Sequence, residues 1–247
     1  MEPSKLLEIF EKIKNNYNCI VEKAQNAAIK SNRNFDDIKI IPVSKTQAAK
    51  IVEIAYNAGI NVFGENYVQE LIDKQEILSD KGFNNLEWHY IGHLQTNKVK
   101  YIAPFINLVH SVDSVKVANE IDKRAKLLNK NIDILIQVNT SGEFNKSGFD
   151  IERYIDSIAE IDLLSNINIK GLMTIGTFTD DEKTQRQEFT LLRNSLEEVN
   201  RQLNKNWTQL SMGMTSDFEI AIDEGATMIR IGTAIFGERQ YRNLEND

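Results

Sequence analysis

The stretch IKIIPVSKTQAAKIVEIA, residues 38–55, decides between the two folds that the sequence allows. It begins with an apolar run, 38–43, which is typical of a buried β-strand, and continues with helical spacing over 46–57. The turn between them holds Lys45 and contains no glycine. A doubly wound open sheet would need a glycine-rich turn after its first strand, so this stretch favours a barrel.

Further apolar runs follow along the chain, separated by stretches with helical spacing. Several of them, such as 133–138, are apolar without alternating polar positions, which is typical of strands buried on both faces of a parallel sheet. Eight strands that alternate with helices predict a single closed (β/α)8 TIM barrel in the α/β class. The predicted strands are 38–43, 61–63, 86–91, 107–110, 133–138, 169–175, 208–212 and 228–231.

An additional helix precedes this repeat. Its apolar residues follow one another in steps of three and four over 6–28, which predicts an amphipathic helix. Two helix starts are also predicted, one capped by Asp150 and one formed by Ser216 and Glu219 at capping-box spacing. We find no linker or change of composition, so the whole chain, 1–247, is expected to form one domain.

The composition excludes several classes of protein. The chain has 247 residues and a net charge of −7, which argues against a general nucleic-acid binder with a basic patch. Its one cysteine, Cys19, excludes an intrachain disulfide framework and a metal site built from several cysteines. The charged N-terminus lacks the apolar segment of a signal peptide, and no apolar run is long enough to cross a membrane. A cytoplasmic protein that binds neither membrane nor nucleic acid is expected.

Polar and small residues follow the carboxyl end of every predicted strand, where barrels of this kind build their active sites. The last two strands end in Ser211 with Gly213 and in Gly232 with Thr233. The loops after these two strands commonly bind phosphate, and glycine lets the backbone approach an anion closely. The pattern therefore indicates a site for a phosphorylated small molecule, although a purely structural turn explains the glycines equally well.

Three roles are open for Lys45 at the end of the first strand. It contacts the phosphate, or it forms a Schiff base with an aldehyde, or it extends to solvent and pairs with Glu65. The Schiff base needs an amine that can lose its proton, which partial burial and a cationic neighbour favour. Arg230 in the last strand is a candidate for that neighbour.

Longer motifs resolve this choice. They occur in order over nearly the whole chain: VSKTQ (43–47), FGENYVQE (63–70), WHYIGHLQTNK (88–98), HSVDS (110–114), VNTSGEFNKSGF (138–149), GLMTIG (171–176) and LSMGMTSDFEIAIDEGATMIRIGTAIFGER (210–239). On these motifs the chain resembles the pyridoxal 5′-phosphate (PLP) homeostasis protein family, also called the YggS/PROSC or PLP-binding protein family. One departure is visible, since Thr215 stands where the family usually has serine. Threonine keeps the hydroxyl, so little changes.

The resemblance implies a barrel like the N-terminal domain of alanine racemase, without the second domain of that enzyme, and PLP held as a Schiff base on Lys45. It implies phosphate contacts from Ser211 and the turn at 232–233, and places Arg230 near the pyridine nitrogen. Asn66 belongs to the same pocket, with Met212 and Gly213 as its wall. The implied cofactor-binding residues are Lys45, Asn66, Ser211, Met212, Gly213, Arg230, Gly232 and Thr233.

An arginine beside the pyridine nitrogen limits the chemistry. Arg230 stays protonated and disfavours a second positive charge on the ring, which makes the ring a weaker electron sink. Most PLP enzymes place an acidic partner there instead. We therefore expect a protein of vitamin B6 homeostasis that holds and delivers PLP without strong catalysis, with no catalytic or metal-binding residues. The alternative is an alanine-type amino-acid racemase. Apo forms of PLP-dependent enzymes are the expected acceptors, and a monomer is expected.

Overall fold

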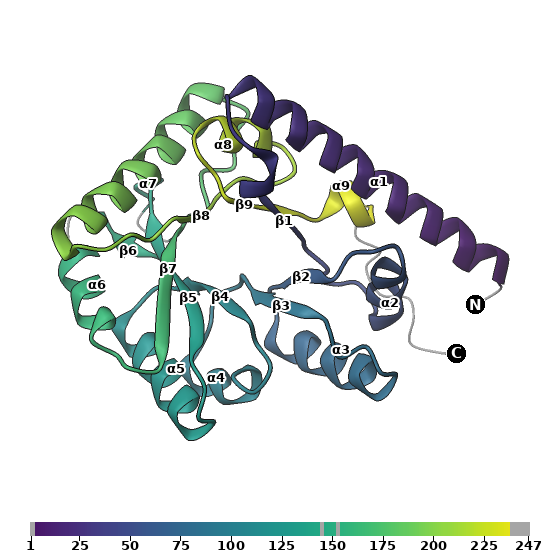
Figure 1. The fold of residues 1–247 in the computed structure, drawn as a ribbon, viewed down its shortest axis with the longest axis horizontal. Coiled ribbons are helices and arrows are strands. Elements are labelled where there is room, and N and C mark those ends of the chain that lie inside the picture. The colour runs from purple at the N-terminus through teal and green to yellow at the C-terminus, as the bar shows by residue number, and fades with distance from the viewer. Residues whose placement is uncertain (1–2, 144–145, 152–153, 238–247) are drawn as a thin grey trace.

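The computed structural model describes residues 3–143, 146–151 and 154–237, and eight strands in this part of the chain form a parallel barrel (Figure 1). The order around the barrel is β1-β9-β8-β7-β5-β4-β3-β2. A parallel bridge between Val43 and Gly64 closes it, with the Ser44 N–H donating to the Gly64 carbonyl at 3.0 Å. The barrel strands are β1 (Lys39–Pro42), β2 (Val62–Glu65), β3 (Glu87–Tyr90), β4 (Leu108–Val112), β5 (Ile132–Asn139), β7 (Ile167–Met173), β8 (Gln209–Ser211) and β9 (Met228–Ile231).

Each predicted strand overlaps one barrel strand, so the predicted fold class is confirmed. The sequence did not reveal a further two-residue strand, β6 (Phe149–Asp150), which pairs with β5. Asp150 is the second residue of this strand, and the start of the helix that it was predicted to cap falls at 152–153, outside the described residues. The helices are α1 (Pro3–Lys30), α2 (Ala49–Asn57), α3 (Val68–Asp80), α4 (Thr96–Ile102), α5 (Val115–Leu127), α6 (Tyr154–Asp162), α7 (Glu182–Leu203), α8 (Phe218–Asp223) and α9 (Thr233–Phe236), with a 3-10 turn at Phe35–Asp37.

Helix α1 is the predicted additional element, and it runs along the outside of the barrel beside α8, α9 and α2 (Figure 1). It buries Ile13, Ile20 and Ala24 at helical spacing against these elements. Hydrogen bonds also hold it in place. Asn16, in the middle of α1, donates from Nδ2 to the Ile235 carbonyl at 3.0 Å, and Arg33, just after α1, donates from Nη1 to the Ile222 carbonyl at 2.7 Å. Helix α1 therefore connects the last two helices of the barrel, α8 and α9, with its first helix, α2.

Two helix starts differ from the prediction. Helix α2 begins at Ala49 and not at 46, because Thr46 has a φ of +66°, in the left-handed region. The predicted capping box before α8 is not formed, since Asp217 is the N-cap residue and its carboxylate accepts from the Met214 N–H. Both departures lengthen the turn after a strand and so shape the carboxyl end of the barrel.

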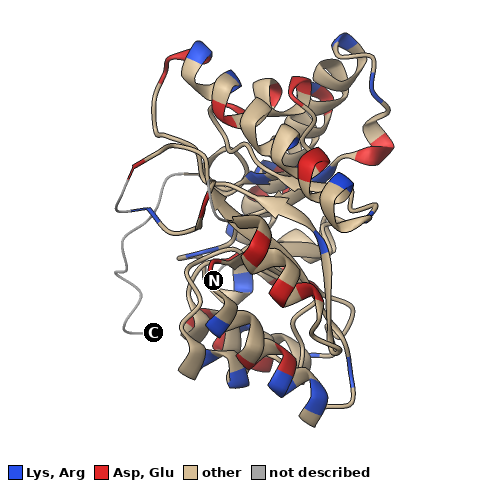
Figure 2. Ribbon diagram, turned by 90° about the vertical axis from the view of Figure 1, so that its left-hand side faces the viewer, with Lys and Arg blue, Asp and Glu red and all other residues tan. Residues whose placement is uncertain are grey.

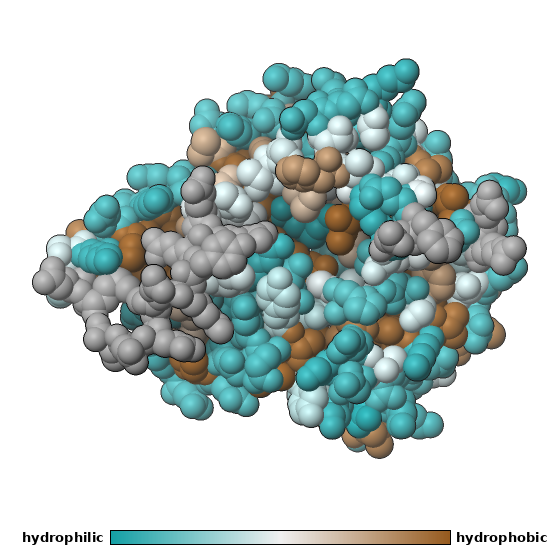
Figure 3. Space-filling view, turned by 180° about the vertical axis from the view of Figure 1, so that it is seen from behind, coloured by the Kyte–Doolittle hydropathy of each residue, from teal (hydrophilic) through white to brown (hydrophobic). Residues whose placement is uncertain are grey.

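The interior has two apolar layers. The large one lies between strands and helices, and the small one inside the barrel consists of Ile41, Leu108, Leu135, Met173 and Met228. Acidic and basic residues alternate over the outer helices (Figure 2). On one face of the molecule, hydrophilic side chains surround apolar atoms nearer the centre (Figure 3). No helix in the described part of the chain is both long and apolar enough to span a membrane.

Candidate functional site

The eight residues expected to bind a cofactor lie in or directly after four neighbouring barrel strands, in the order β2, β1, β9 and β8. Lys45 follows β1 and Asn66 follows β2, while Arg230 lies within β9. Ser211 ends β8, with Met212 and Gly213 after it, and Gly232 and Thr233 follow β9. The fold thus gathers on one side of the barrel residues that are up to 188 positions apart, from 45 to 233.

Lys45 is half-buried in a turn whose flanking residues are held by helix α3. Lys74 Nζ donates to the Ser44 carbonyl at 2.7 Å, and the Thr46 N–H donates to Glu70 Oε2 at 2.8 Å. The Ser44 hydroxyl donates to Glu65 Oε1 at 2.6 Å. The backbone on both sides of Lys45 is therefore fixed by two side chains of α3, and Glu65 of β2 holds the Ser44 hydroxyl.

A buried ion pair lies at the centre of this arrangement. Lys74 is 4% exposed, and its Nζ lies 2.5 Å from Oε1 of Glu65, which is fully buried. Burial raises the pKa of Glu65, while the charge of Lys74 opposes that rise. The carboxylate that the sequence offered as a partner for Lys45 thus bonds Lys74 and Ser44. We name Ser44, Glu65, Glu70 and Lys74 the α3 clamp.

Sequence reasoning missed Lys74, although a signal was present. Lys74 stands three residues after Leu71 and four before Leu78, on the buried face of α3. A lysine at an apolar position of an amphipathic helix indicates a buried partner.

Arg230 is 5% exposed and points into the barrel. Its Nη1 donates to the Ser211 hydroxyl at 2.7 Å and its Nη2 to the Thr174 carbonyl at 2.8 Å. Burial lowers the pKa of Arg230 to about 10, against the opposing charge of Asp217, so the guanidinium stays protonated at neutral pH. A fixed cation therefore lies at the carboxyl end of the barrel.

Asn66 has a buried hydrogen-bond acceptor that is unsatisfied within the described part of the chain. Its Oδ1 is buried and has no hydrogen-bond partner among the described residues. Its backbone carbonyl accepts from the Tyr90 hydroxyl at 3.0 Å, and a Cβ at Gly92 would lie 2.2 Å from that carbonyl oxygen. A buried acceptor held in place without a partner is a natural contact for a bound molecule.

Two glycine turns complete the site beside Arg230. Gly213 has a φ of +87°, and a Cβ there would lie 2.5 Å from the Cβ of Ala221. Its carbonyl accepts from the Arg230 N–H at 3.0 Å, so a hydrogen bond fixes this turn to β9. Gly232 precedes the exposed Thr233, and its carbonyl accepts from the Ile235 N–H at 3.0 Å. The Met212 side chain, in contrast, is fully buried in the main core.

A family model described as "Alanine racemase, N-terminal domain" matches residues 11–240. The "Pyridoxal phosphate homeostasis protein" of Aquifex aeolicus is 42% identical over 90% of this chain and 96% of its own length. The human protein of the same name is 38% identical over 90% of this chain and 85% of its own. The chain belongs to the pyridoxal phosphate homeostasis protein family, within the wider group that shares the alanine racemase N-terminal domain.

Solved structures agree with this family. PipY of Synechococcus elongatus, solved with PLP bound, has a TM-score of 0.77 and 34% identity, covering 88% of this chain and all of its own. A protein from Bifidobacterium adolescentis has a TM-score of 0.86 and 31% identity, covering 96% and 97%. Alanine racemase of Clostridium difficile, with a TM-score of 0.69 and 18% identity, covers 94% of this chain and 57% of its own, and it shows the fold alone.

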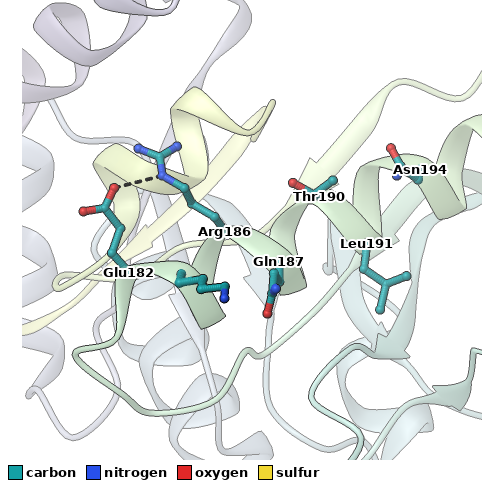
Figure 4. Close-up of a pocket in the computed structure, with 7 residues that line it drawn as sticks. Glu182, Arg186, Gln187, Thr190, Leu191 and Asn194 are labelled. Carbon is teal, nitrogen blue, oxygen red and sulfur yellow. Dashed lines mark hydrogen bonds and ion pairs between the residues drawn. The ribbon is translucent and has the colours of Figure 1, made fainter.

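Two surface hollows lie away from the eight residues expected to bind a cofactor. One, of about 640 Å³, runs along α7, where Arg186 Nε bonds Glu182 at 2.9 Å (Figure 4). The other, of about 1180 Å³, is lined by residues at the amino ends of the strands, among them Lys39, Glu87 and Asp133. We call that end the barrel floor. The first hollow lies along the outer helix α7, and the second lies at the barrel floor.

Proposed function

We propose that the chain binds PLP at the carboxyl ends of β1, β2, β8 and β9 and holds it as a Schiff base on Lys45. The observation that carries the proposal is that a half-buried lysine follows β1 while a buried arginine lies in the neighbouring strand β9. The names of the relatives and the PLP bound to PipY support it. The aldehyde of PLP supplies the chemistry that this lysine needs.

The other residues of the site divide the remaining contacts. The glycine turns at 213 and 232 place backbone next to the ligand without a side chain in the way, which suits a phosphate. Thr233 adds an exposed hydroxyl beside them, and Asn66 offers its unpartnered Oδ1. Met212 forms the wall behind this turn. These features fit the charge and the polar groups of PLP.

Ser211 has a different role in this proposal from the phosphate contact that the family resemblance implies. Its side chain is fully buried, and its oxygen already bonds Arg230 at 2.7 Å and His110 at 2.8 Å. We therefore assign to Ser211 the support of Arg230, and leave the phosphate to the two glycine turns and Thr233.

The chain holds and delivers PLP in vitamin B6 homeostasis and does not turn over amino acids at enzymic rates. Arg230 supports this part, because a fixed guanidinium at the ring nitrogen disfavours the protonated ring that most PLP enzymes use. The acceptors in this proposal are apo forms of PLP-dependent enzymes in the cytoplasm. The chain acts as a monomer and as one PLP-binding domain over 1–247.

The test is borohydride reduction of the PLP-loaded protein, followed by absorbance and mass analysis. Wild type should retain PLP covalently, and Lys45→Ala should not. Lys50→Ala is the matched control, because Lys50 lies on α2 five residues away and pairs with Glu53. Equal labelling of Lys45→Ala contradicts the attachment point. Racemisation of alanine at enzymic rates by the loaded wild type contradicts the carrier role.

A further inference from the structure

Side chains from four strands form a continuous hydrogen-bonded chain through the barrel. Glu87 Oε1 lies 2.7 Å from His89 Nε2, and His89 Nδ1 lies 2.9 Å from His110 Nε2. His110 Nδ1 lies 2.8 Å from the Ser211 hydroxyl, which accepts from Arg230. We name this set the relay: Glu87, His89, His110 and Ser211.

The two ends of the relay determine where every proton lies. Arg230 only donates, so the Ser211 oxygen accepts from it. At the other end Glu87 is ionised, since the His89 hydrogen bond, assisted by Lys39, lowers its pKa to about 2 against the effect of burial. Glu87 therefore accepts from His89 Nε2–H.

Neutral rings then allow one arrangement. A neutral His89 with its proton on Nε2 accepts at Nδ1 from His110 Nε2–H. A neutral His110 accepts at Nδ1 from the Ser211 hydroxyl. Every hydrogen bond thus points from Arg230 toward Glu87. Reversing the direction while Glu87 stays ionised requires an extra proton on one of the two rings.

The surroundings keep both rings neutral. His110 is fully buried, and burial lowers its pKa well below the ordinary value, with the charges of Arg230 on β9 and Lys39 on β1 acting in the same direction. Burial also lowers the pKa of His89, although Glu87 opposes this. The charged groups facing the rings are therefore Glu87, Lys39 and Arg230.

We propose that the relay positions the Arg230 guanidinium from beneath the candidate site and couples it to the barrel floor. Glu87 and His89 line the cavity at the floor, where Lys39 Nζ bonds Glu87 at 2.7 Å. A change of charge at Glu87 alters the direction of the Ser211 hydroxyl without any movement of the backbone. The relay residues are positioning residues, because they act on a ligand through Arg230.

The first experiment reads ring tautomers in the PLP-free protein by ¹⁵N NMR. The chain contains three histidines, and the third, His93, is exposed and serves as the reference for assignment. We expect His89 and His110 to carry their protons on Nε2 in wild type. In Glu87→Gln the amide both accepts and donates, so His110 should show a second form with its proton on Nδ1.

The matched control is Asp133→Asn, which also removes a carboxylate charge from the floor. Asp133 bonds Asn168 at 2.8 Å and Lys170 at 3.3 Å, outside the relay. Its His110 spectrum should match wild type. A proton on Nδ1 of either buried ring in wild type, or an unchanged His110 in Glu87→Gln, overturns the relay.

The second experiment rests on the proposed function and uses PLP itself. Glu87→Gln should raise the Kd for PLP about twofold to thirtyfold, the range over which packed networks couple sites, and shift the absorbance of the bound form. Asp133→Asn should change neither. Altered tautomers with unaltered PLP binding would overturn the coupling to Arg230, whereas a wild type that binds no PLP would overturn the proposed function and leave the NMR result standing.

Discussion

Two regions of the barrel each fix a basic residue at the candidate site, and they do so with different chemistry. The α3 clamp holds the backbone on both sides of Lys45, and within it Lys74 pairs with Glu65 at 2.5 Å and with Glu70 at 3.5 Å. The relay holds Arg230 by its side chain, through neutral rings that end in a distant carboxylate. One region orients an amine by its backbone, and the other maintains a buried guanidinium.

The difference has a physical reason. A lysine that forms a Schiff base has to lose its proton, and an ion pair with Glu65, the partner that the sequence offers, would oppose this. Lys74 occupies Glu65 Oε1, at 2.5 Å. An arginine that acts only by its charge has to keep that charge, so it needs neutral hydrogen-bond acceptors. The Ser211 hydroxyl and the Thr174 carbonyl are such acceptors for Arg230.

The largest effect is expected from a substitution that removes the buried ion pair of the α3 clamp. Lys74→Met leaves the Glu65 carboxylate buried without its partner, so the free energy of unfolding should fall by about 3–5 kcal/mol at neutral pH. Urea unfolding measures it. The exposed pair of Lys81 with Glu53 is the control, and Lys81→Met should cost about 0–1 kcal/mol. Equal losses in the two variants would show that the clamp contributes no more than a surface pair.

The second effect concerns the turn at Gly213, whose carbonyl accepts from the Arg230 N–H. Gly213→Ala combines a left-handed φ with a Cβ 2.5 Å from Ala221, so we expect a loss of about 2–4 kcal/mol in unfolding free energy. Gly59→Ala is the control, since its φ is +94° with no atom within 4 Å of the added Cβ, and strain alone should cost about 1 kcal/mol. Thermal unfolding measures both variants. If the two substitutions lower Tm equally, the close approach of Gly213 to Ala221 does not contribute to the loss of stability.

The third effect is a dependence on pH. Glu87 has a folded-state pKa lowered to about 2, by the His89 hydrogen bond first and Lys39 second, against an ordinary value of 4.5. A lowered acid pKa contributes stability that is present above pH 4.5 and is lost as the pH falls toward 2. Because Glu87 is partly exposed, we expect a contribution of about 1–2 kcal/mol.

Comparison of wild type with Glu87→Gln by urea unfolding at several pH values measures this contribution. Wild type should be the more stable near neutral pH, and the difference should shrink between pH 4.5 and 2. Asp133→Asn, at the same floor, should not reproduce that pH profile. A difference that stays constant with pH would show that Glu87 is not held ionised by His89.

The barrel could be predicted from the sequence because its strands are local apolar runs, and Lys45 could be placed because it directly follows the first of them. The relay could not, because His89 and His110 lie 21 residues apart and meet only when β3 and β4 pair. Ser211 shows the same limit, since nothing local to it indicates that a histidine from β4 occupies its hydroxyl.

The start of α2 shows a second kind of limit. Helical spacing at 46–57 predicted a helix from its first residue, yet Thr46 has a φ of +66° and the helix begins at Ala49. A β-branched residue with positive φ costs free energy, so residue propensity does not predict this conformation at Thr46. The clamp accounts for it, because the Thr46 N–H reaches Glu70 Oε2 at 2.8 Å in this conformation.

The smallest effect follows from that strain. Thr46→Gly should raise the free energy of unfolding by about 0.5–1 kcal/mol, since glycine adopts positive φ without a steric cost. Asn32→Gly is the control, because asparagine tolerates its φ of +53° and little gain is expected. If Glu70→Gln is added, Thr46→Gly should still stabilise, since the strain lies in the backbone and not in the hydrogen bond. A destabilised Thr46→Gly would mean that the threonine side chain itself supports the turn at Lys45, and the clamp would then act from within the turn as well as from α3.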